Sequence, residues 1–427
     1  MMATWTSTTL GSICKFQAGD GFPKDLQGDA DGEYPVAKVS DMNLAGNELF
    51  IVNANNWLSK KAVDKAFKLH PPGAVIFAKI GIALTSNRRR ILVRPTVIDN
   101  NMMSATCAKD IDPRWFYSLL TTLDFNEISS GSALPFLTVR DLSKIPISVP
   151  PLPEQRAIAT TLGALDDKIE LNRKMNATLD SMARALFRDW FVDFGPTRAK
   201  MEGRAPYLSS DIWAMFPENL DDEGKPEEWE VSAIGQEVSV VGGSTPSTAE
   251  AEFWDGTLSW ATPKDLSNLS APVLLETSRK ITAAGLAKIS SGLLPVGSVL
   301  LSSRAPIGYL AIAEVPVAIN QGFIGMVCDK RLSNAFVWLW TLANMDAILS
   351  KANGSTFQEI SKGNFRPLPV IIASAEILAA FDAVVKPLYA RIARNERESN
   401  TLAQTRDLLL PRLMSGEISI SDILHVG

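Results

Sequence analysis

The sequence predicts an α+β protein in which two tandem strand-rich domains are each followed by a long α-helix. Three observations predict this fold: a repeat of the first half of the chain in the second, short strand patterns punctuated by glycine and proline at the start of each copy, and a heptad pattern at its end. We expect the two helices to pack as an antiparallel coiled coil, which gives the chain a pseudo-two-fold internal repeat.

The repeat has a constant offset over most of the strand-rich part, equal to the step from Trp5 to Trp229. The residues Gly11, Gly19, Asp41, Leu69, Pro71 and Gly73 recur at the same offset as Gly235, Gly243, Asp265, Leu293, Pro295 and Gly297. A long period that occurs only twice indicates duplication of a whole domain with its trailing segment, since a solenoid needs shorter and more numerous units. Two such copies can each bind one half of a two-part target.

Length and composition fit a globular protein with two or three domains, because the 427 residues are 46% hydrophobic and 21% charged. Neither a signal-peptide pattern nor an apolar run long enough to span a bilayer is present, so we expect a cytoplasmic protein that does not enter a membrane. Three cysteines and two histidines predict neither a zinc site nor a disulfide framework.

Each strand-rich copy contains a short apolar run that reads as a buried strand, at 74–77 in the first copy and 298–301 in the second. Aromatic and leucine residues at helical spacing predict short helices at 113–123 and 333–349. We assign the aromatic residues of these helices to the domain cores. They are Trp115, Phe116, Trp338 and Trp340.

A heptad seam follows the first domain and predicts a helix over 154–190, roughly 55 Å long at 1.5 Å per residue. The seam positions are Ile158, Leu162, Leu165, Ile169, Asn172, Asn176, Leu179, Ala183, Leu186 and Trp190. Those of the second helix, over 376–414, are Ile377, Phe381, Val384, Leu388, Arg391, Asn395, Leu402, Arg406, Leu409 and Leu413. Polar residues interrupt the middle of both seams, and we expect them to fix the register and the partner.

These patterns divide the chain into six segments. They are domain 1 (1–150), helix 1 (151–195), an irregular linker (196–228), domain 2 (229–373), helix 2 (374–418) and a C-terminal tail (419–427).

A search for catalytic motifs predicts no enzyme. The chain has no phosphate-binding loop, no dinucleotide fingerprint and no Asn/Asp-Pro-Pro-aromatic tetrapeptide of an amino-methyltransferase. Asp41, Asp141 and Asp265 are scattered and lack the spacing of nuclease metal ligands. With two histidines in the chain, a catalytic triad based on histidine is nearly excluded. We therefore predict no catalytic and no metal-binding residue.

The loops of both copies instead carry groups that read DNA, because Arg and Lys suit guanine edges, Asn and Gln suit adenine, and hydroxyls suit phosphate. The candidates in the first copy are Lys38, Ser40, Lys79, Asn87, Arg88, Arg89, Arg90, Asn100, Asn101 and Ser132. Those in the second are Thr262, Lys264, Ser302, Ser303, Arg304, Asn320, Gln321, Ser355 and Thr356. A solvated loop is an equally good interpretation of the three consecutive arginines.

The net charge argues against a chain that binds DNA tightly by itself. With 42 Lys and Arg against 47 Asp and Glu, the formal charge is −5. Phosphate contacts supply much of the affinity of DNA-binding proteins, so the basic surface is either local or supplied by a second protein.

Several segments resemble the specificity subunit of type I restriction–modification systems over nearly the whole chain. They are Trp5, Leu10 and Gly11, then IPISVPPLPEQR (145–156), LFRDWFVDF (186–194), Pro226 with Trp229 and Glu230, and LLPRLMSGEI (409–418). The second copy departs from this pattern, since 373–376 (ASAE) replaces the prolines and lacks the Gln-Arg pair.

The resemblance implies a non-catalytic subunit with two target recognition domains, each reading half of an asymmetric two-part sequence in double-stranded DNA. It implies that the helices dock two adenine methyltransferase subunits, joined by restriction subunits with motor and nuclease activity. S-adenosylmethionine, ATP and magnesium would belong to those partners, and this chain would hold no cofactor. We expect the partner interface at Leu165, Ile169, Asn172, Leu179, Leu186, Phe187, Trp190, Leu388, Asn395, Leu402, Leu409 and Leu410.

Two other classes of function are alternatives to this one. The chain could be a self-contained DNA nuclease or methyltransferase, against which the missing motifs argue. It could also be a protein-only scaffold with a helical spacer, which salt-dependent DNA binding in the presence of partner subunits distinguishes from a DNA reader.

Overall fold

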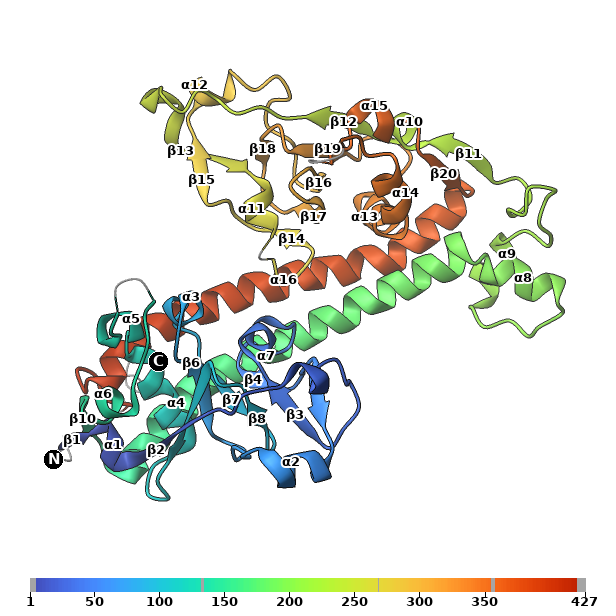
Figure 1. Cartoon of the computed structure of the whole chain (residues 1–427). Coiled ribbons are helices and arrows are strands. Elements are labelled where there is room, and N and C mark those ends of the chain that lie inside the picture. The colour runs from blue at the N-terminus through green and yellow to red at the C-terminus, as the bar shows by residue number, and fades with distance from the viewer. Residues whose placement is uncertain (1–4, 132–133, 268, 355–357, 421–427) are drawn as a thin grey trace. The chain divides into compact units, whose positions relative to one another are not determined.

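The computed structural model describes residues 5–131, 134–267, 269–354 and 358–420 (Figure 1). The chain forms two compact units. Unit 1 comprises Met1–Lys174 and Glu398–Gly427, and unit 2 comprises Met175–Arg397. Each unit contains one strand-rich domain and a stretch of both long helices, α7 (Leu152–Phe187) and α16 (Ala375–Met414). Within the described residues, no helix has the length and apolarity to cross a membrane.

Unit 1 builds three sheets. β1 (Thr6–Thr9) pairs with β10 (Pro146–Val149). A five-stranded sheet has the order β2 (Cys14–Ala18), β9 (Met102–Cys107), β6 (Val75–Ala78), β7 (Arg90–Leu92), β4 (Phe50–Ile51). A three-stranded sheet has the order β5 (Asn56–Leu58), β3 (Tyr34–Ala37), β8 (Val97–Ile98). The helices are α1 (Leu10–Ile13), η1 (Lys24–Leu26), η2 (Val39–Asn43), α2 (Lys60–Ala66), α3 (Ile82–Thr85), α4 (Pro113–Thr122), α5 (Phe125–Ile128) and α6 (Val139–Ser143).

Unit 2 repeats this topology. β11 (Glu230–Ala233) pairs with β20 (Pro369–Ile372). The five-stranded order is β12 (Ser239–Gly242), β19 (Phe323–Val327), β16 (Val299–Ser303), β17 (Ile307–Ala313), β14 (Val273–Leu274), and the three-stranded order is β15 (Arg279–Ile281), β13 (Trp254–Ala261), β18 (Val317–Ile319). The helices of its domain are α10 (Ile234–Glu237), η4 (Ala251–Phe253), α11 (Pro263–Leu266), α12 (Ala283–Leu286), α13 (Asn334–Ala343), α14 (Met345–Ser350) and α15 (Lys362–Phe365). The matching strand orders confirm the duplication.

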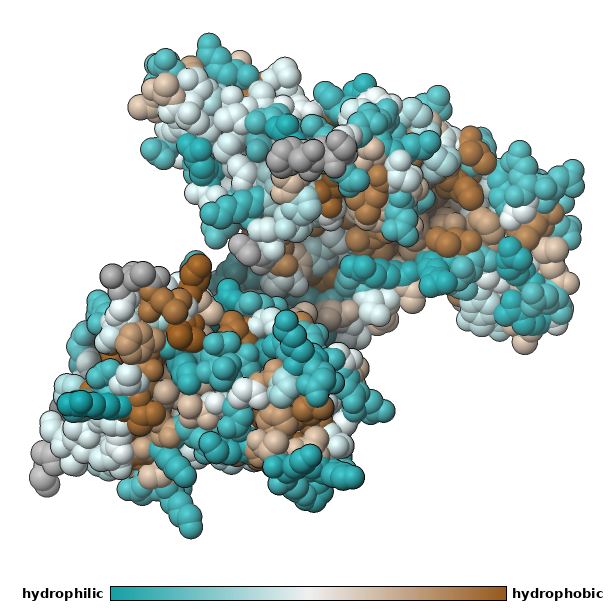
Figure 2. All heavy atoms as spheres, viewed as in Figure 1, coloured by the Kyte–Doolittle hydropathy of each residue, from teal (hydrophilic) through white to brown (hydrophobic). Residues whose placement is uncertain are grey.

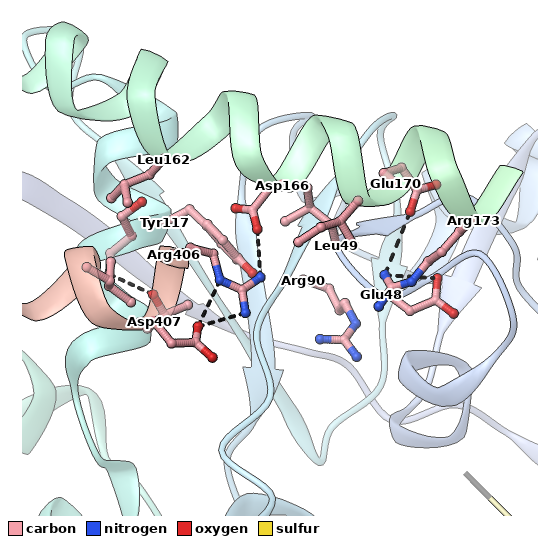
Figure 3. A pocket seen from close by; sticks show the side chains of 14 residues that line it. Glu48, Leu49, Arg90, Tyr117, Leu162, Asp166, Glu170, Arg173, Arg406 and Asp407 are labelled. Atoms are coloured by element: carbon pink, nitrogen blue, oxygen red, sulfur yellow. Dashed lines mark hydrogen bonds and ion pairs between the residues drawn. The ribbon is translucent and has the colours of Figure 1, made fainter. Parts of the chain in front are cut away.

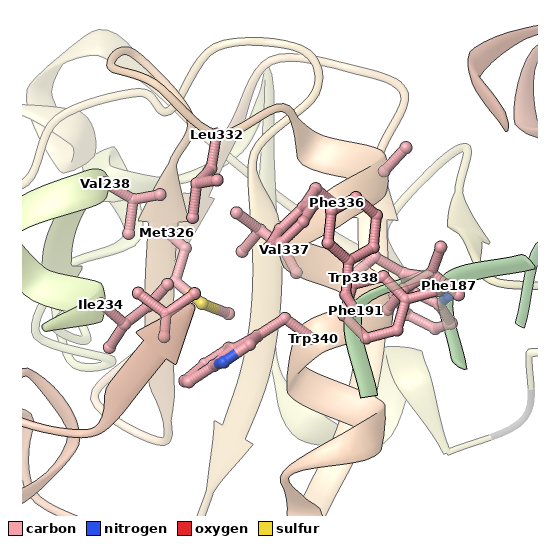
Figure 4. Packing of buried hydrophobic residues seen from close by; sticks show 14 of the residues in the cluster. Phe187, Phe191, Ile234, Val238, Met326, Leu332, Phe336, Val337, Trp338 and Trp340 are labelled. Carbon is pink, nitrogen blue, oxygen red and sulfur yellow. The ribbon is translucent and has the colours of Figure 1, made fainter. Parts of the chain in front are cut away.

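The predicted buried strands are the central strands of the two larger sheets. All residues of β6 and β16 are buried, and each strand has a partner on both sides. The aromatic residues Trp115, Phe116, Trp338 and Trp340 are buried as expected. In unit 2 they belong to a large aromatic cluster, in which Phe336 packs against Phe187 and Phe191 (Figure 4).

The two long helices pack antiparallel within each unit. In unit 1, Asp166 of α7 accepts a 2.7 Å hydrogen bond from Arg406 of α16, and farther along α7 Asn172 donates to Ser399 over 3.2 Å. In unit 2, Asp180 accepts from Tyr389 over 3.0 Å. Positions rise along α7 as they fall along α16, which confirms the predicted antiparallel arrangement.

The predicted seam of the second helix is wrong at two positions. Val384 is 43% exposed and Arg391 is also exposed, whereas the neighbouring Val385 and Ile392 are fully buried. The buried face begins with successive steps of four residues, Ile377, Phe381, Val385 and Tyr389. The predicted pattern, with its alternating steps of three and four residues, therefore places Val384 and Arg391 one residue before the positions that are buried, Val385 and Ile392.

Part of the predicted partner interface is also wrong, because five of its residues are buried inside the units. Phe187 and Trp190 are 4% and 1% exposed within the aromatic cluster of unit 2. Ile169 and Asn172 are buried in unit 1, and Asn395 is buried in unit 2. The half-buried remainder is Leu165, Leu179, Leu186, Leu388, Leu402, Leu409 and Leu410.

The segment between the copies is more ordered than predicted. After α7 come a π-helical turn, η3 (Arg188–Val192), and two helices, α8 (Gly195–Met201) and α9 (Ser210–Met215). Phe194 and Phe216 pack into the core of unit 2 beside Trp229. This segment is therefore part of unit 2 and not only a connector.

The end of α16 completes the core of unit 1. Leu413 is fully buried and Met414 nearly so, in one cluster with Leu10, Ile158 and Leu162. The first domain therefore needs a helix that the chain supplies about 260 residues after that domain ends.

Candidate nucleic-acid interface

Backbone hydrogen bonds join the ends of three strands at one edge of each domain. In unit 1, Asp99 N donates to Ala37 O over 3.1 Å and Lys79 N donates to Asn101 O over 2.8 Å. In unit 2, Asn320 N donates to Ala261 O and Ser303 N donates to Gly322 O, over 3.1 and 2.7 Å. We call this the loop edge of each unit. It comprises 37–41, 79–81 and 99–101 in unit 1, and 261–265, 303–304 and 320–322 in unit 2.

The first segment of each loop edge is a turn capped by a repeated aspartate. Asp41 accepts from Lys38 N over 2.8 Å and from the Asn55 side chain over 2.6 Å. Asp265 accepts from Thr262 N over 2.7 Å and from Ser278 N over 2.8 Å. Burial opposes ionisation of Asp265, but these hydrogen bonds hold its pKa below the usual value. The aspartates thus have a structural role.

A glycine lets a second loop pass close to each loop edge. A side chain on Gly19 would overlap the carbonyl oxygens of Ile98 and Asp99, and one on Gly243 would overlap those of Ile319 and Asn320. Gly19 N donates to Met102 O over 3.1 Å, so the loop is also bonded there. This close approach explains why glycine occurs at both positions of the repeat.

A further loop joins each edge after the central strand. Leu137 N donates to Lys79 O over 2.8 Å, and Ile360 N donates to Ser303 O over 3.0 Å. Arg304 lies here, 3.6 Å from the Glu359 carboxylate. The candidates Ser132, Ser355 and Thr356 fall outside the described residues.

The structure brings ten of the predicted DNA-binding residues together at the loop edges. Ser40, Asn100, Asn101, Lys264 and Gln321 are exposed, and Lys38, Lys79, Thr262, Arg304 and Asn320 are half-buried. That these residues contact DNA stays a prediction. The backbone bonds also establish the correspondence between the copies, in which Asp99 matches Asn320, Asn100 matches Gln321 and Asn101 matches Gly322.

The prediction of DNA contact is wrong for one of the three consecutive arginines, Arg89, whereas Arg90 is half-buried. Arg89 is 2% exposed, and its guanidinium lies 3.7 Å from the centre of the Phe125 ring and donates to Leu123 O over 2.5 Å. Burial lowers the pKa of Arg89 to about 10. Arg90 donates to Arg89 O and to Met42 O, over 2.8 and 3.1 Å. Only Arg88 is exposed.

Arg90 faces a polar cavity of about 440 Å³ within unit 1. Figure 3 shows it beside Tyr117 of α4, with Glu170 of α7 and Arg406 of α16 among the lining residues. Burial lowers the pKa of Arg90 and raises that of Tyr117. Arg90 therefore packs between the strand-rich domain and the helices, and this position explains its presence without DNA.

Three more candidates have structural roles. Ser302 is fully buried, and its hydroxyl accepts from Tyr309 N and donates to Pro306 O, both over 2.8 Å. Ser303 is 3% exposed. Asn87 Oδ1 accepts from Phe125 N over 3.0 Å and so anchors α5. The prediction of DNA contact is wrong for the two buried serines, and the bond of Asn87 gives it a local function.

Sequence reasoning missed two features near the loop edges. The hydroxyl of Thr245 donates to Gln321 Oε1 over 2.5 Å, a contact across 76 residues that no local pattern signals. In unit 1, apolar side chains gather around α3 and the loop before α6 (Figure 2). Ile82 is 87% exposed there, and Leu134 and Phe136 are 56% and 40% exposed. No local signal marked this patch, because Ile82 lies in an apolar run with Ile80 and Leu84, and Leu84 is buried.

The chain is similar to proteins of one kind along most of its length. The family model described as "Type I restriction modification DNA specificity domain" matches residues 2–181 and again 226–400. The HindI specificity subunit of Haemophilus influenzae is 26% identical, with coverage of 84% of this chain and 88% of that protein. The MjaIX specificity subunit of Methanocaldococcus jannaschii is 25% identical, with coverage of 94% and 93%.

The fold is also similar to a solved structure. The type I restriction–modification S subunit from M. genitalium superposes with a TM-score of 0.57 at 14% identity, covering 96% of each chain. The family model matches twice, once in each strand-rich domain and its following helix, as the duplicated topology requires. The chain therefore belongs to the type I restriction–modification DNA specificity family.

Proposed function

We propose that this chain reads an asymmetric DNA target in two parts, one part through each loop edge, for a type I restriction–modification complex. Membership of the specificity family makes the chain a DNA-recognition component and not the catalytic subunit. The proposal of a two-part target rests on one observation: the same backbone arrangement occurs twice, with different side chains in the two copies. Lys79 corresponds to Ser303, and Asn101 to Gly322. Two edges that differ in this way favour two different half-sequences.

The DNA contacts we propose are those of the accessible residues at the loop edges. Lys38, Lys79, Lys264 and Arg304 supply positive charge, and the exposed amides supply base-edge hydrogen bonds. Arg88 is exposed on the segment after α3 and adds a phosphate contact. The proposal omits the buried Arg89, Ser302 and Ser303.

Two methyltransferase subunits are the partners we propose, one on the helical part of each unit. Each unit exposes large apolar side chains there, Leu171 (52%) and Leu408 (64%) in unit 1, and Met182 (55%) and Val384 (43%) in unit 2. Exposed apolar residues of this size fit a protein interface better than solvent. A partner with a basic surface would also offset the net charge of −5.

The remaining components follow from the same proposal. We expect S-adenosylmethionine to bind the methyltransferase subunits, and ATP with magnesium to bind restriction subunits, while this chain holds no cofactor. A complex that acts on the DNA of its own cell works in the cytoplasm, which is where we place this chain.

Binding selection from a random duplex library tests the proposal. The full-length chain, assembled with a type I methyltransferase subunit of its host, is the bait. We expect enrichment of two short, different sequences separated by a fixed unread gap. A single continuous motif, a palindrome or no enrichment would overturn the two-part asymmetric target.

A further inference from the structure

We propose that Asn100 and Gln321 are corresponding base-reading residues, and that each recognises the major-groove edge of an adenine in its own half of the target. The inference rests on the proposed function and adds to it the residue and the base. It starts from the middle position of the same three-residue turn in both units, 99–101 and 320–322.

In unit 1, four hydrogen bonds hold this turn, and none of them uses the side chain of its middle residue, Asn100. Asp99 N donates to Ala37 O over 3.1 Å, and Asp99 Oδ1 accepts from Asn101 N over 2.8 Å. Met102 N donates to Asp99 O and closes the turn, and Lys79 N donates to Asn101 O. Asn100 is exposed, and within the described residues its amide has no hydrogen-bond partner.

In unit 2, the equivalent turn is held in the same way. Asn320 N donates to Ala261 O over 3.1 Å, Asn320 Oδ1 accepts from Gly322 N over 2.8 Å, and Ser303 N donates to Gly322 O. Gly322 fits because a side chain there would come within about 3 Å of Pro263. Gln321 is exposed at the middle position.

The other two positions of the turn cannot serve as a shared reading position. Asp99 and Asn320 use their Oδ1 atoms to close the turn, and a carboxylate at the first position repels phosphate. The third position is Asn101 in one unit and Gly322 in the other, which has no side chain. Only the middle position carries an exposed amide in both units.

An amide on a rigid turn is suited to adenine. It presents one acceptor and one donor side by side, which match the N6 amino group and N7 of adenine in the major groove. Thr245 fixes the orientation of the Gln321 amide, since its hydroxyl donates to Gln321 Oε1 over 2.5 Å. One lone pair of that oxygen remains for adenine, and the Nε2 group remains a donor. Thr245 is therefore a positioning residue.

The test is binding selection from the random duplex library with the full-length chain in its methyltransferase complex, as wild type and as Asn100→Ala, Gln321→Ala and Thr245→Val. We expect Asn100→Ala to lower the preference for adenine at one position of one half by about tenfold. Gln321→Ala does the same in the other half, and Thr245→Val has a smaller effect at that same position. Thr245→Ser retains the hydroxyl and restores the preference.

Asn219→Ala is the matched control, because Asn219 is an exposed amide in the segment between the domains, far in sequence from both turns. It should select the wild-type sequence. The inference is wrong if the wild type selects a two-part motif and both amide variants select the same one, or if the affected base is not adenine. Loss of a whole half in either variant also contradicts it, because that indicates a supporting role. A wild type that selects no motif overturns the proposed function itself.

Discussion

Asn395 Nδ2 donates a 2.8 Å hydrogen bond to Asn176 Oδ1, between α16 and α7 within unit 2. Both side chains are nearly fully buried, and Asn176 Nδ2 also donates to Glu396 Oε1 over 2.7 Å. A paired polar contact inside an apolar seam is satisfied only in one alignment of the helices, so it selects that alignment over slipped ones.

Replacing one partner of this pair should be worse than replacing both. Asn176→Leu removes the oxygen that accepts from Asn395 Nδ2, and we expect a loss of about 1–3 kcal/mol in the free energy of unfolding. The double variant Asn176→Leu/Asn395→Leu should recover most of that loss, because both polar groups are gone. Urea unfolding measures this, with the exposed Asn400→Leu as the control. A double variant less stable than Asn176→Leu alone would contradict this expectation.

The end of α16 should stabilise unit 1 through Leu413 and not through its exposed neighbour. Leu413→Ala removes a fully buried side chain and should cost about 2–5 kcal/mol. Leu408 is 64% exposed on the same helix, so Leu408→Ala should have little effect on folding. Amide hydrogen exchange resolves the two units. We expect faster exchange in unit 1 alone, and equal effects of the two substitutions would refute the assignment.

His70 should make unit 1 sensitive to mild acid. Burial lowers the pKa of His70 to about 4, and its Nδ1 lies 2.7 Å from Ser104 Oγ. The unfolded chain takes up a proton near pH 6.5, whereas the folded state resists it, so this contribution is complete above that pH and is lost as the pH falls toward 4. The melting temperature should fall less steeply over this range in His70→Gln. Identical pH profiles for the two proteins would contradict the assignment.

The glycine beside each loop edge should be needed for only one half of the target. A side chain on Gly243 would overlap backbone carbonyl oxygens of the 319–320 segment, so Gly243→Ala should displace the turn that carries Gln321. Selection from the duplex library should then lose the sequence read by unit 2 and keep that read by unit 1. Gly363→Ala, where the added carbon would meet Ser361 Oγ at an ordinary contact distance of 3.6 Å, controls for the substitution itself. Loss of both halves would point to general unfolding.

The sequence predicted those features that depend on local pattern or on the repeat. The matched glycines and aspartates have the same backbone role in both units, and the heptad spacing of α7 places its buried face correctly. β6 and β16 were recognisable because each is a short apolar run after a proline-glycine turn.

Other features depend on contacts between residues far apart, which a local pattern does not contain. Arg89 is buried because Phe125 covers it, and Phe187 is buried because Phe336 and Phe381 surround it. The Thr245–Gln321 contact likewise joins two loops that are separated in sequence by the six strands β13 to β18. Their sequence context suggests that such residues are accessible, whereas tertiary contacts bury them or pair them.

Exchange of one recognition domain tests whether each unit reads its own half of the target. Residues 5–149 are replaced by the matching domain of another member of the family, and the chimera, in its methyltransferase complex, undergoes selection from the random duplex library. Independent reading by the two units predicts that the sequence of one half changes, while the other half and the gap between them remain those of the wild type. A change in both halves, or in neither, would contradict independent reading by the two units.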